Sequence, residues 1–281
     1  MFKIVSKQKL APKEFDLWVE APRVATHAKA GQFIVLRVNE TGERIPLTIA
    51  DHDAAKGLIR IVFQVVGKTT ALLSNLNVGD SIHDISGPLG TPSEIKNYGT
   101  VMMVGGGVGI AALYPIIRAL KEAGNKVITI LGGRTASLVL MKDDCKKYSD
   151  ELIVTTDDGS EGIKGVVTQA MKMVVDRGEK VDQAWCIGPS IMMKFGEKAA
   201  AELNLPIWVS LNPLMVDGTG MCGCCRVSID GKIYFACVDG PEFDGHKVNW
   251  DEFMSRMKQY KDEEKISMDK YIEEVGEQTW L

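Results

Sequence analysis

The sequence predicts two main domains, an antiparallel β-barrel and then a doubly wound α/β domain, followed by a small cysteine-rich segment and a helical tail. Three observations lead to this prediction. Short runs rich in valine, isoleucine and phenylalanine fill the chain up to about residue 98. Strand and helix patterns then alternate up to about residue 210. Four of the six cysteines lie between Cys222 and Cys237. We therefore expect domains at residues 1–98, 99–210, 211–248 and 249–281.

Turn sequences such as Ala30-Gly31 and Val78-Gly79-Asp80 separate the expected strands of the first domain. Short strands at regular spacing are typical of a small antiparallel barrel. These strands are expected at residues 2–5, 15–19, 32–38, 59–66 and 81–85.

In the second domain, short apolar runs alternate with amphipathic helix patterns, which predicts a parallel, doubly wound sheet. The strands are expected at residues 101–104, 126–131, 152–155, 184–187 and 207–210, with helices at residues 110–123, 165–177 and 190–203.

The last expected helix covers residues 249–260, with Asn249 as its N-cap and Glu252 placed to complete a capping box. Its large apolar side chains share one face: Trp250, Phe253, Met254, Met257 and Tyr260. This face either packs on the protein itself or docks on a partner, and both interpretations stay open.

Composition and charge exclude some classes of function. The formal net charge of -4 gives no electrostatic case for nucleic-acid binding. The most hydrophobic span, residues 101–120, contains a glycine run and Pro115, so it fits a strand, a turn and a helix better than a membrane span. Residues 1–7 lack the apolar core of a signal peptide, and we expect a cytoplasmic protein.

The cysteine-rich segment begins Asp217-Gly-Thr-Gly-Met-Cys222-Gly-Cys224-Cys225, and Cys237 follows. Plant-type iron–sulfur sites use the spacing C-x4-C-x2-C with a fourth, more distant cysteine. Asp217 then occupies the first ligand position, followed by Cys222, Cys225 and Cys237. Clustered thiolates also bind structural zinc, which is the main alternative. Disulfides fit a reducing cytoplasm less well.

The barrel contains Arg44-Ile45-Pro46-Leu47-Thr48, where a cation and a hydroxyl stand near each other on one expected strand. Such a pair suits a flavin, which needs a cation for its pyrophosphate and a donor near its ring; an ordinary exposed strand is the alternative. Val66-Gly67-Lys68-Thr69-Thr70 is expected to open a helix whose free N–H groups favour a phosphate. The glycine that would make it a P-loop is missing.

Val104-Gly105-Gly106-Gly107-Val108-Gly109 follows an expected strand and opens a helix, a context that suits a nucleotide pyrophosphate. Arg134-Thr135 ends the next strand, where the adenosine ribose is expected; Arg134 does not decide between NAD and NADP. Gly188-Pro189 places a turn at the carboxyl edge of the sheet, where open α/β sheets bind ligands.

These motifs together resemble the ferredoxin–NADP reductase superfamily: R-I-P-L-T, G-G-G-V-G, G-G-R-T and G-P-S-I-M-M. The cysteine segment is similar to that of the branch with the electron-transfer subunit of dihydroorotate dehydrogenase. E-R-I-P-L-T-I-A, T-D-D-G-S and the aspartate in place of the first cysteine most resemble the small (alpha) subunits of NADH-dependent reduced ferredoxin:NADP oxidoreductase, also known as sulfide dehydrogenase subunits. The resemblance covers nearly the whole chain.

The resemblance implies a set of cofactor-binding residues and no catalytic side chain. FAD would be bound by Arg44, Pro46, Leu47, Thr48, Val62, Phe63, Gln64, Thr69 and Thr70. The nicotinamide nucleotide would be bound by Gly106, Gly107, Val108, Gly109, Arg134, Thr135, Asp157, Asp158, Gly188 and Pro189. A [2Fe-2S] cluster would be bound by Asp217, Cys222, Cys225 and Cys237. Asp157 and Asp158 are expected to form a turn near the nucleotide.

Two departures from the family pattern affect these assignments. Arg44 stands one residue farther from Thr48 than the superfamily arginine usually does. Cys186 is separated from Gly188 by Ile187, whereas the superfamily cysteine directly precedes this glycine. We therefore expect Cys186, like Cys145, to be a buried structural residue.

The function implied is an oxidoreductase subunit that passes electrons between NAD(H), or NADP(H), FAD and the cluster. The acceptor would lie in a larger flavin- and [4Fe-4S]-containing subunit that handles ferredoxin and NADPH, in an electron-bifurcating heterodimer. One alternative is the electron-transfer subunit of a dihydroorotate dehydrogenase or a hydrogenase. Another, of a different class, is a zinc-stabilised nucleotide-sensing module.

Overall fold

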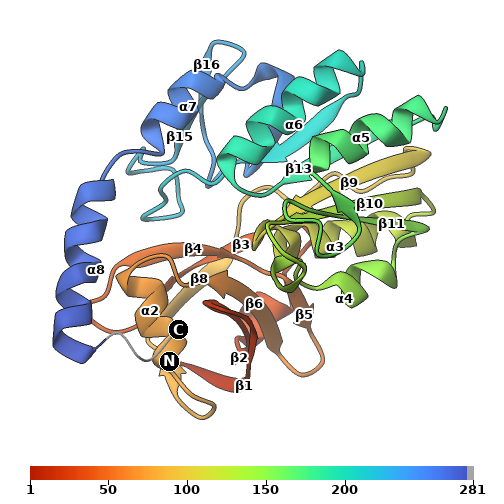
Figure 1. Cartoon of the computed structure of the whole chain (residues 1–281). Coiled ribbons are helices and arrows are strands. Elements are labelled where there is room, and N and C mark those ends of the chain that lie inside the picture. The colour runs from red at the N-terminus through yellow and green to blue at the C-terminus, as the bar shows by residue number, and fades with distance from the viewer. Residues whose placement is uncertain (277–281) are drawn as a thin grey trace.

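In the computed structural model, which describes residues 1–276, the chain forms the predicted barrel and then the predicted parallel sheet (Figure 1). The barrel has two antiparallel sheets, with strand orders β5-β6-β2-β1-β7 and β4-β3-β8. Its elements are β1 (Phe2–Ala11), β2 (Glu14–Glu20), α1 (Pro22–Ala25), β3 (Phe33–Arg37), β4 (Arg44–Thr48), β5 (Asp51–Asp53), β6 (Leu58–Gln64), α2 (Lys68–Asn75), β7 (Ser81–Ile82) and β8 (Asp84–Leu89). The run expected at residues 81–85 is thus two strands.

Residues of β6 alternate between two packing environments, as the two-residue period of a strand requires. Ile59, Ile61 and Phe63 lie in the barrel core. Val62 lies in a separate apolar cluster that includes Ala111 of the second domain. The strand therefore lines the barrel core and also contacts the second domain.

The second domain is built on a seven-stranded sheet with the order β12-β11-β10-β9-β13-β14-β17. All pairs are parallel except the last, β14 with β17. Its strands are β9 (Thr100–Gly106), β10 (Lys126–Gly133), β11 (Glu151–Thr156), β12 (Ile163–Lys164), β13 (Gln183–Ile187), β14 (Ile207–Ser210) and β17 (Glu242–Asp244). The chain moves outward from β9 in both directions, which is the doubly wound arrangement.

Helices cover both faces of this sheet. They are α3 (Gly109–Glu122), α4 (Lys142–Lys146), α5 (Val167–Asp176) and α6 (Ser190–Glu202), with the short 3-10 helix η1 (Ala136–Leu138). Val101 and Met103 share an apolar cluster with α3, whereas Met102 and Val104 share one with α5 and α6. Because consecutive side chains of a strand point to opposite faces, β9 contributes to both layers of the core.

The cysteine-rich segment forms a loop, a hairpin and the edge strand β17. The hairpin pairs β15 (Arg226–Ile229) with β16 (Lys232–Phe235). Glu242 of β17 accepts hydrogen bonds from the indole of Trp185 at 3.0 Å and from the hydroxyl of Ser93, in the linker between the first two domains. The segment is therefore attached to the second domain and to the linker.

The predicted tail helix is shorter than expected. After η2 (Gly245–Lys247), α7 (Trp250–Arg256) begins at the predicted N-cap, Asn249, whose side chain accepts a hydrogen bond from the Glu252 N–H at 3.1 Å. Tyr260 has a left-handed backbone, with φ 65°, so the chain turns there into a second helix, α8 (Lys261–Val275). Trp250 and Phe253 are buried in the protein core, which confirms the packing interpretation for these two residues.

Helix α8 returns to the barrel and lies beside α2 (Figure 1). The hydroxyl of Tyr271 accepts a hydrogen bond from Asn75 of α2 at 2.8 Å, and its ring is buried in the barrel core. Residues 277–281 of the predicted tail lie outside the described residues. None of the helices in residues 1–276 is long and apolar enough to cross a membrane.

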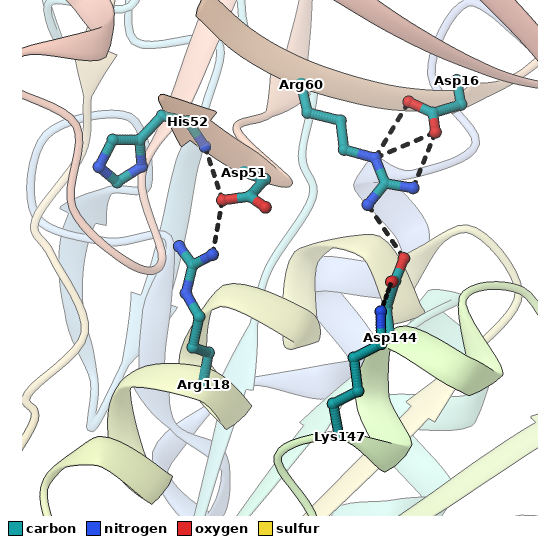
Figure 2. A network of polar contacts seen from close by, with 7 residues as sticks. All are labelled: Asp16, Asp51, His52, Arg60, Arg118, Asp144 and Lys147. Carbon is teal, nitrogen blue, oxygen red and sulfur yellow. Dashed lines mark hydrogen bonds and ion pairs between the residues drawn. The ribbon is translucent and has the colours of Figure 1, made fainter. Parts of the chain in front are cut away.

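Two ion-paired groups connect the barrel to the second domain (Figure 2). Arg60 of β6 binds Asp16 of β2 at 2.7 Å and Asp144 of α4 at 3.0 Å. Arg118 of α3 binds Asp51 of β5 at 2.7 Å. These contacts, made by largely buried side chains, orient the two domains around the space between them.

Candidate functional site

A cavity of about 700 Å³ lies between the barrel and the second domain. Strands β4 and β6 and the start of α2 form one wall, and the carboxyl ends of β9, β10, β11 and β13 form the other. Its volume is in the range of ligand sites in proteins. Most of the predicted cofactor-binding residues line it: Pro46, Leu47, Thr48, Val62, Phe63, Gln64, Thr70, Gly106, Gly107, Val108, Gly109, Arg134, Asp157, Gly188 and Pro189.

Four predicted residues are not among those that line the cavity. Arg44 is exposed at the first position of β4 and forms an ion pair with Asp84 at 3.8 Å. The Thr69 hydroxyl donates to Glu43 at 3.3 Å. The other two, Thr135 and Asp158, are described with the nucleotide wall below.

The start of α2 has the form that the sequence predicts, a glycine turn that opens a helix. The Thr70 hydroxyl accepts hydrogen bonds from the N–H groups of Val66 and Gly67, at 3.0 and 3.1 Å. This hydroxyl therefore stabilises the turn itself. The contribution of α2 to a phosphate would come chiefly from the N–H groups of its first turn.

The nucleotide wall follows the glycine turn between β9 and α3. Gly107 has a left-handed backbone, with φ +53°. A Cβ atom on Gly109 would lie 2.5 Å from the Cα atom of Gly188, so the two turns approach each other as closely as glycine permits. The N–H groups of Ile110 and Ala111 donate to the carbonyls of Gly107 and Val108, at 3.2 and 3.0 Å. The positive end of the α3 dipole still favours a pyrophosphate at this turn.

The loop after β11 forms the predicted turn. The N–H of Asp157 donates to the carbonyl of Gly133 at 3.1 Å, and that of Asp158 donates to Arg134 at 3.2 Å. Asp157 lines the cavity, whereas the Asp158 carboxylate accepts hydrogen bonds from Ser160.

Thr135 also has a local partner. Its hydroxyl lies 3.0 Å from that of Ser137 in η1. On the nucleotide wall, Arg134 and Asp157 are therefore the charged side chains at the cavity.

Two buried polar side chains on the cavity walls were missed by the sequence analysis. Glu14 is 1% exposed and Thr155 is 1% exposed, and one side-chain oxygen of each has no hydrogen-bond partner among the described residues. Buried polar groups are nearly always paired, so unpaired ones facing a cavity indicate a polar occupant. The cavity therefore combines glycine turns that can approach a pyrophosphate with polar groups that lack a partner, and this combination fits FAD and a nicotinamide nucleotide. A glutamate at the start of a strand carries no sequence signal for such a position.

Asp217 is held as an anion by the backbone of the cysteine loop. Its carboxylate accepts hydrogen bonds from the N–H groups of Thr219 and Cys222, at 2.9 and 2.8 Å. These hydrogen bonds lower the pKa of Asp217, and the bond from Thr219 has the largest effect. Asp217 is therefore ionised, which is the form in which a carboxylate can ligate a metal.

The cysteines of the segment approach one another in pairs. Cys225 and Cys237 are buried, and their Sγ atoms are 3.2 Å apart. Burial raises the pKa of Cys237 to about 12. The side chain of Cys224 forms a hydrogen bond with the exposed Cys222, which raises the pKa of Cys224. Ligation would require these thiols to lose their protons.

Asp217, Cys222 and Cys225 precede the β15–β16 hairpin, and Cys237 follows it. One carboxylate and three thiols fit a [2Fe-2S] cluster by their chemistry. In residues 1–276, no three histidine, cysteine or acidic side chains converge as the ligands of one metal ion would. A two-iron cluster shares its ligands between two irons and does not need that convergence. The loop also needs its glycines: Gly218 has φ +74°, and a Cβ there would lie 2.6 Å from Leu89.

Cys145 and Cys186 are fully buried, as predicted. Burial raises the pKa of each thiol to about 12. Both are therefore neutral packing residues rather than nucleophiles or ligands.

Three family models match successive parts of the chain. An oxidoreductase FAD-binding domain matches residues 2–93, and an oxidoreductase NAD-binding domain matches residues 103–198. The iron–sulfur cluster binding domain of dihydroorotate dehydrogenase B matches residues 212–249, which include Asp217 and the four clustered cysteines. The cavity thus lies between the FAD- and NAD-binding domains.

A relative from Thermotoga maritima, described as a homolog of the electron transfer subunit of dihydroorotate dehydrogenase B (NAD(+)), is 57% identical over 98% of this chain and 96% of its own length. The chain belongs to this family of electron-transfer subunits. The dihydroorotate dehydrogenase B electron transfer subunit of Desulforamulus reducens is 34% identical over 89% of this chain and 97% of its own length.

A solved structure of NADH-dependent reduced ferredoxin–NADP oxidoreductase, from work on flavin-based electron bifurcation, is also similar to this electron-transfer subunit. It is 56% identical with a TM-score of 0.92, and the alignment covers 97% of this chain and 98% of the other. These findings confirm the predicted ferredoxin–NADP reductase-like superfamily and an oxidoreductase with FAD-binding, NAD-binding and iron–sulfur-binding domains. They favour iron–sulfur over zinc at the cysteines.

Proposed function

We propose that this electron-transfer subunit carries electrons between NAD(H) and a larger partner subunit, as part of an electron-bifurcating NADH-dependent reduced ferredoxin:NADP oxidoreductase. The observation that carries the proposal is the 56% identity to a chain of that oxidoreductase over nearly the full length of both chains. The aspartate at the first ligand position, which the sequence analysis associates with that family, supports it. We also propose that the FAD-binding domain ends at residue 98, the nucleotide-binding domain at residue 210 and the cluster segment at residue 248.

In this proposal the cavity holds both nucleotides. FAD lies against the barrel wall formed by Pro46, Leu47 and Thr48, and the nicotinamide nucleotide lies against the glycine turns at Gly107 and Gly188. When bound, FAD supplies the exchange between two-electron hydride carriers and one-electron centres. The chain itself orients the two nucleotides and lines their cavity with apolar side chains.

The cluster ligands are proposed to be Asp217, Cys222, Cys225 and Cys237. Cys225 and Cys237 are buried on the protein side of the loop, whereas Cys222 is exposed. A carboxylate is a harder ligand than a thiolate, so Asp217 should shift the potential of the cluster from that of an all-cysteine site. The exposed edge of the loop is then the side from which electrons leave.

The partner is proposed to be a larger subunit with its own flavin and [4Fe-4S] centres, which binds ferredoxin and NADPH. The names of the relatives support this, since a chain called an electron transfer subunit implies another subunit. We expect a heterodimer in the cytoplasm. The nucleotide bound by this chain is proposed to be NAD(H), with NADP(H) as the alternative.

A second candidate is the electron-transfer subunit of a dihydroorotate dehydrogenase B, because relatives of that name are 34% and 35% identical and a relative described as its homolog is 57% identical. Copurification separates the two. The tagged chain, expressed from its own genome, should retain a flavin- and [4Fe-4S]-containing subunit and reduce NADP when supplied with NADH and reduced ferredoxin. Retention of a dihydroorotate-oxidising subunit would support the second candidate instead.

Spectroscopy of the isolated chain tests the cofactors independently of any partner. We expect flavin absorption, iron and sulfide in equal amounts, and an electron paramagnetic resonance signal after reduction. Stoichiometric zinc without iron would contradict the cluster assignment.

A further inference from the structure

Glu14 begins β2 and lies on the barrel wall of the cavity. Its side chain is almost completely buried, with the residue 1% exposed. One carboxylate oxygen, Oε1, accepts a hydrogen bond from Gln64 at 3.3 Å. The other oxygen, Oε2, has no partner among the described residues. The carboxyl group thus meets the cavity with one oxygen unused.

Within residues 1–276, no cation pairs with this carboxylate. Among residues 1–276, the titratable side chains that line the cavity are Glu14, Arg134 and Asp157, and the last two belong to the opposite wall. On the strands around Glu14, Asp16 and Arg60 pair with each other. Burial accordingly raises the pKa of Glu14 to about 7.

The charged side chains next to Glu14 do not change this conclusion. Lys13 is exposed, and Lys9 lies farther along β1, opposite Phe15. Asp144, which reaches toward this sheet from α4, is bound by Arg60. Glu14 therefore stands among neutral groups, between Ala11 of β1 and Gln64 of β6.

An unpaired buried carboxyl destabilises the protein, because the group loses its hydrogen bonds to water and gains none in return. An apolar residue would line this wall without that cost. The FAD-binding family model covers this wall, and a flavin offers ring and ribityl acceptors to a donor placed there. A partner supplied by the bound flavin would remove the cost.

We propose that Glu14 contacts the bound flavin through Oε2 as a neutral carboxylic acid that donates a hydrogen bond. This inference rests on the proposed flavin site, and it names the group that sets the pH dependence of that site. Because the acid form is the one that binds, FAD raises the proton affinity of Glu14. Above neutral pH, FAD binding therefore takes up one proton from solvent.

The test is an FAD titration of the full-length chain after reversible flavin removal, from pH 6 to pH 8.5. In the wild-type protein, FAD affinity should fall as pH rises above 7, by up to about tenfold per pH unit. Calorimetry in buffers of different ionisation enthalpy should show proton uptake. Glu14→Gln keeps the shape and a donor but cannot ionise, so its FAD affinity should not vary over this range.

Glu20→Gln is the matched control, because Glu20 is a carboxylate at the other end of the same strand and does not line the cavity. It should retain the pH dependence of the wild-type protein. Equal pH dependence in wild type and Glu14→Gln would overturn the inference and leave the flavin site standing. Proton release on binding, with affinity rising with pH, would show a carboxylate acceptor and would also overturn it.

Failure of the wild-type chain to bind FAD at any pH would contradict the proposed function itself. If Glu14→Gln does not fold, infrared spectroscopy of the wild-type protein decides. Adding FAD at pH 8 should produce a carboxylic acid C=O band, which Glu20→Gln retains. The absence of that band contradicts the inference.

Discussion

Arg60 of the barrel donates a hydrogen bond from Nη1 to Oδ2 of Asp144 in the second domain, at 3.0 Å (Figure 2). The same guanidinium binds Asp16 through Nε and Nη2. The Arg60 side chain is only 13% exposed, so water screens the contact weakly. Such a network should contribute more than an exposed pair of the same geometry.

A double-mutant cycle tests this contribution. Arg60→Met and Asp144→Ala, singly and together, should show a coupling of about 1 kcal/mol in the free energy of unfolding. The matched control is the pair Lys172 and Asp176, whose side chains are 66% and 55% exposed and which should couple by less than about 0.5 kcal/mol. Equal coupling in both pairs would contradict the prediction. Chemical denaturation of the flavin-loaded protein provides the measurement.

His246 joins the cysteine-rich segment to α6. Its Nδ1 lies 2.9 Å from Glu197 and its Nε2 lies 2.8 Å from the carbonyl of Leu205. Both partners are acceptors, so both ring nitrogens donate only in the charged form. Burial lowers the pKa of His246, but these hydrogen bonds and the nearby Asp244 raise it more, and the net value lies above 6.5.

The stability that His246 contributes should therefore depend on pH. With a raised folded-state pKa, the contribution is complete below about pH 6.5 and is lost as pH rises through the folded value. His246→Gln should destabilise the protein by about 1 kcal/mol at pH 6 and by less at pH 9. Thermal unfolding at both values measures this. Glu197→Gln should remove the same pH dependence of stability. If His246→Gln lowers the stability equally at both pH values, the mechanism is wrong.

Much of the second domain could be predicted because its signals are local. The helix expected at residues 110–123 is Gly109–Glu122 in the structure, since a glycine turn and an apolar stripe mark its start and its buried face. Strand β17 could not be predicted, because three residues carry no periodicity. It forms because Phe243 pairs with Val209 and because Glu242 binds Trp185. Helix α8 likewise depends on the contact of Tyr271 with the barrel.

The candidate site divides in the same way. Glycines such as Gly107 and Gly109 predict a nucleotide-binding turn, because such a turn requires backbone conformations and close approaches that only glycine allows. Glu14 does not, because its burial results from barrel closure and domain packing. Arg44 has the residue type that a pyrophosphate needs, yet its side chain is paired with Asp84. Spacing along a strand predicts which residues are neighbours, whereas the partner of a long side chain depends on the whole fold.

Single substitutions can distinguish the residues that ligate the cluster from the neighbouring cysteine that does not. Asp217→Cys should retain a cluster with an altered potential, because a thiolate replaces a harder oxygen ligand. Cys222→Ser should lose most of the cluster. Cys224→Ser should leave the visible and paramagnetic resonance spectra unchanged, although Cys224 forms a hydrogen bond with Cys222. Cluster loss in Cys224→Ser, with retention in Cys222→Ser, would assign the ligand to Cys224 instead.

Gly109→Ala should separate nucleotide binding from flavin binding. The added methyl group would lie 2.5 Å from the Cα atom of Gly188, and backbone rather than a flexible side chain must move to accommodate it. Overpacking of this kind costs about 1–3 kcal/mol, so we expect at least about a fivefold loss of nicotinamide-nucleotide affinity with normal flavin content. Gly67→Ala is the control, because a Cβ there meets no atom within 4 Å. The affinity of this variant for the nicotinamide nucleotide should be unchanged. Rapid-mixing titration with NADH, followed by flavin absorbance, measures both variants. Unchanged affinity in Gly109→Ala would mean that the turns at Gly109 and Gly188 do not bind the nucleotide.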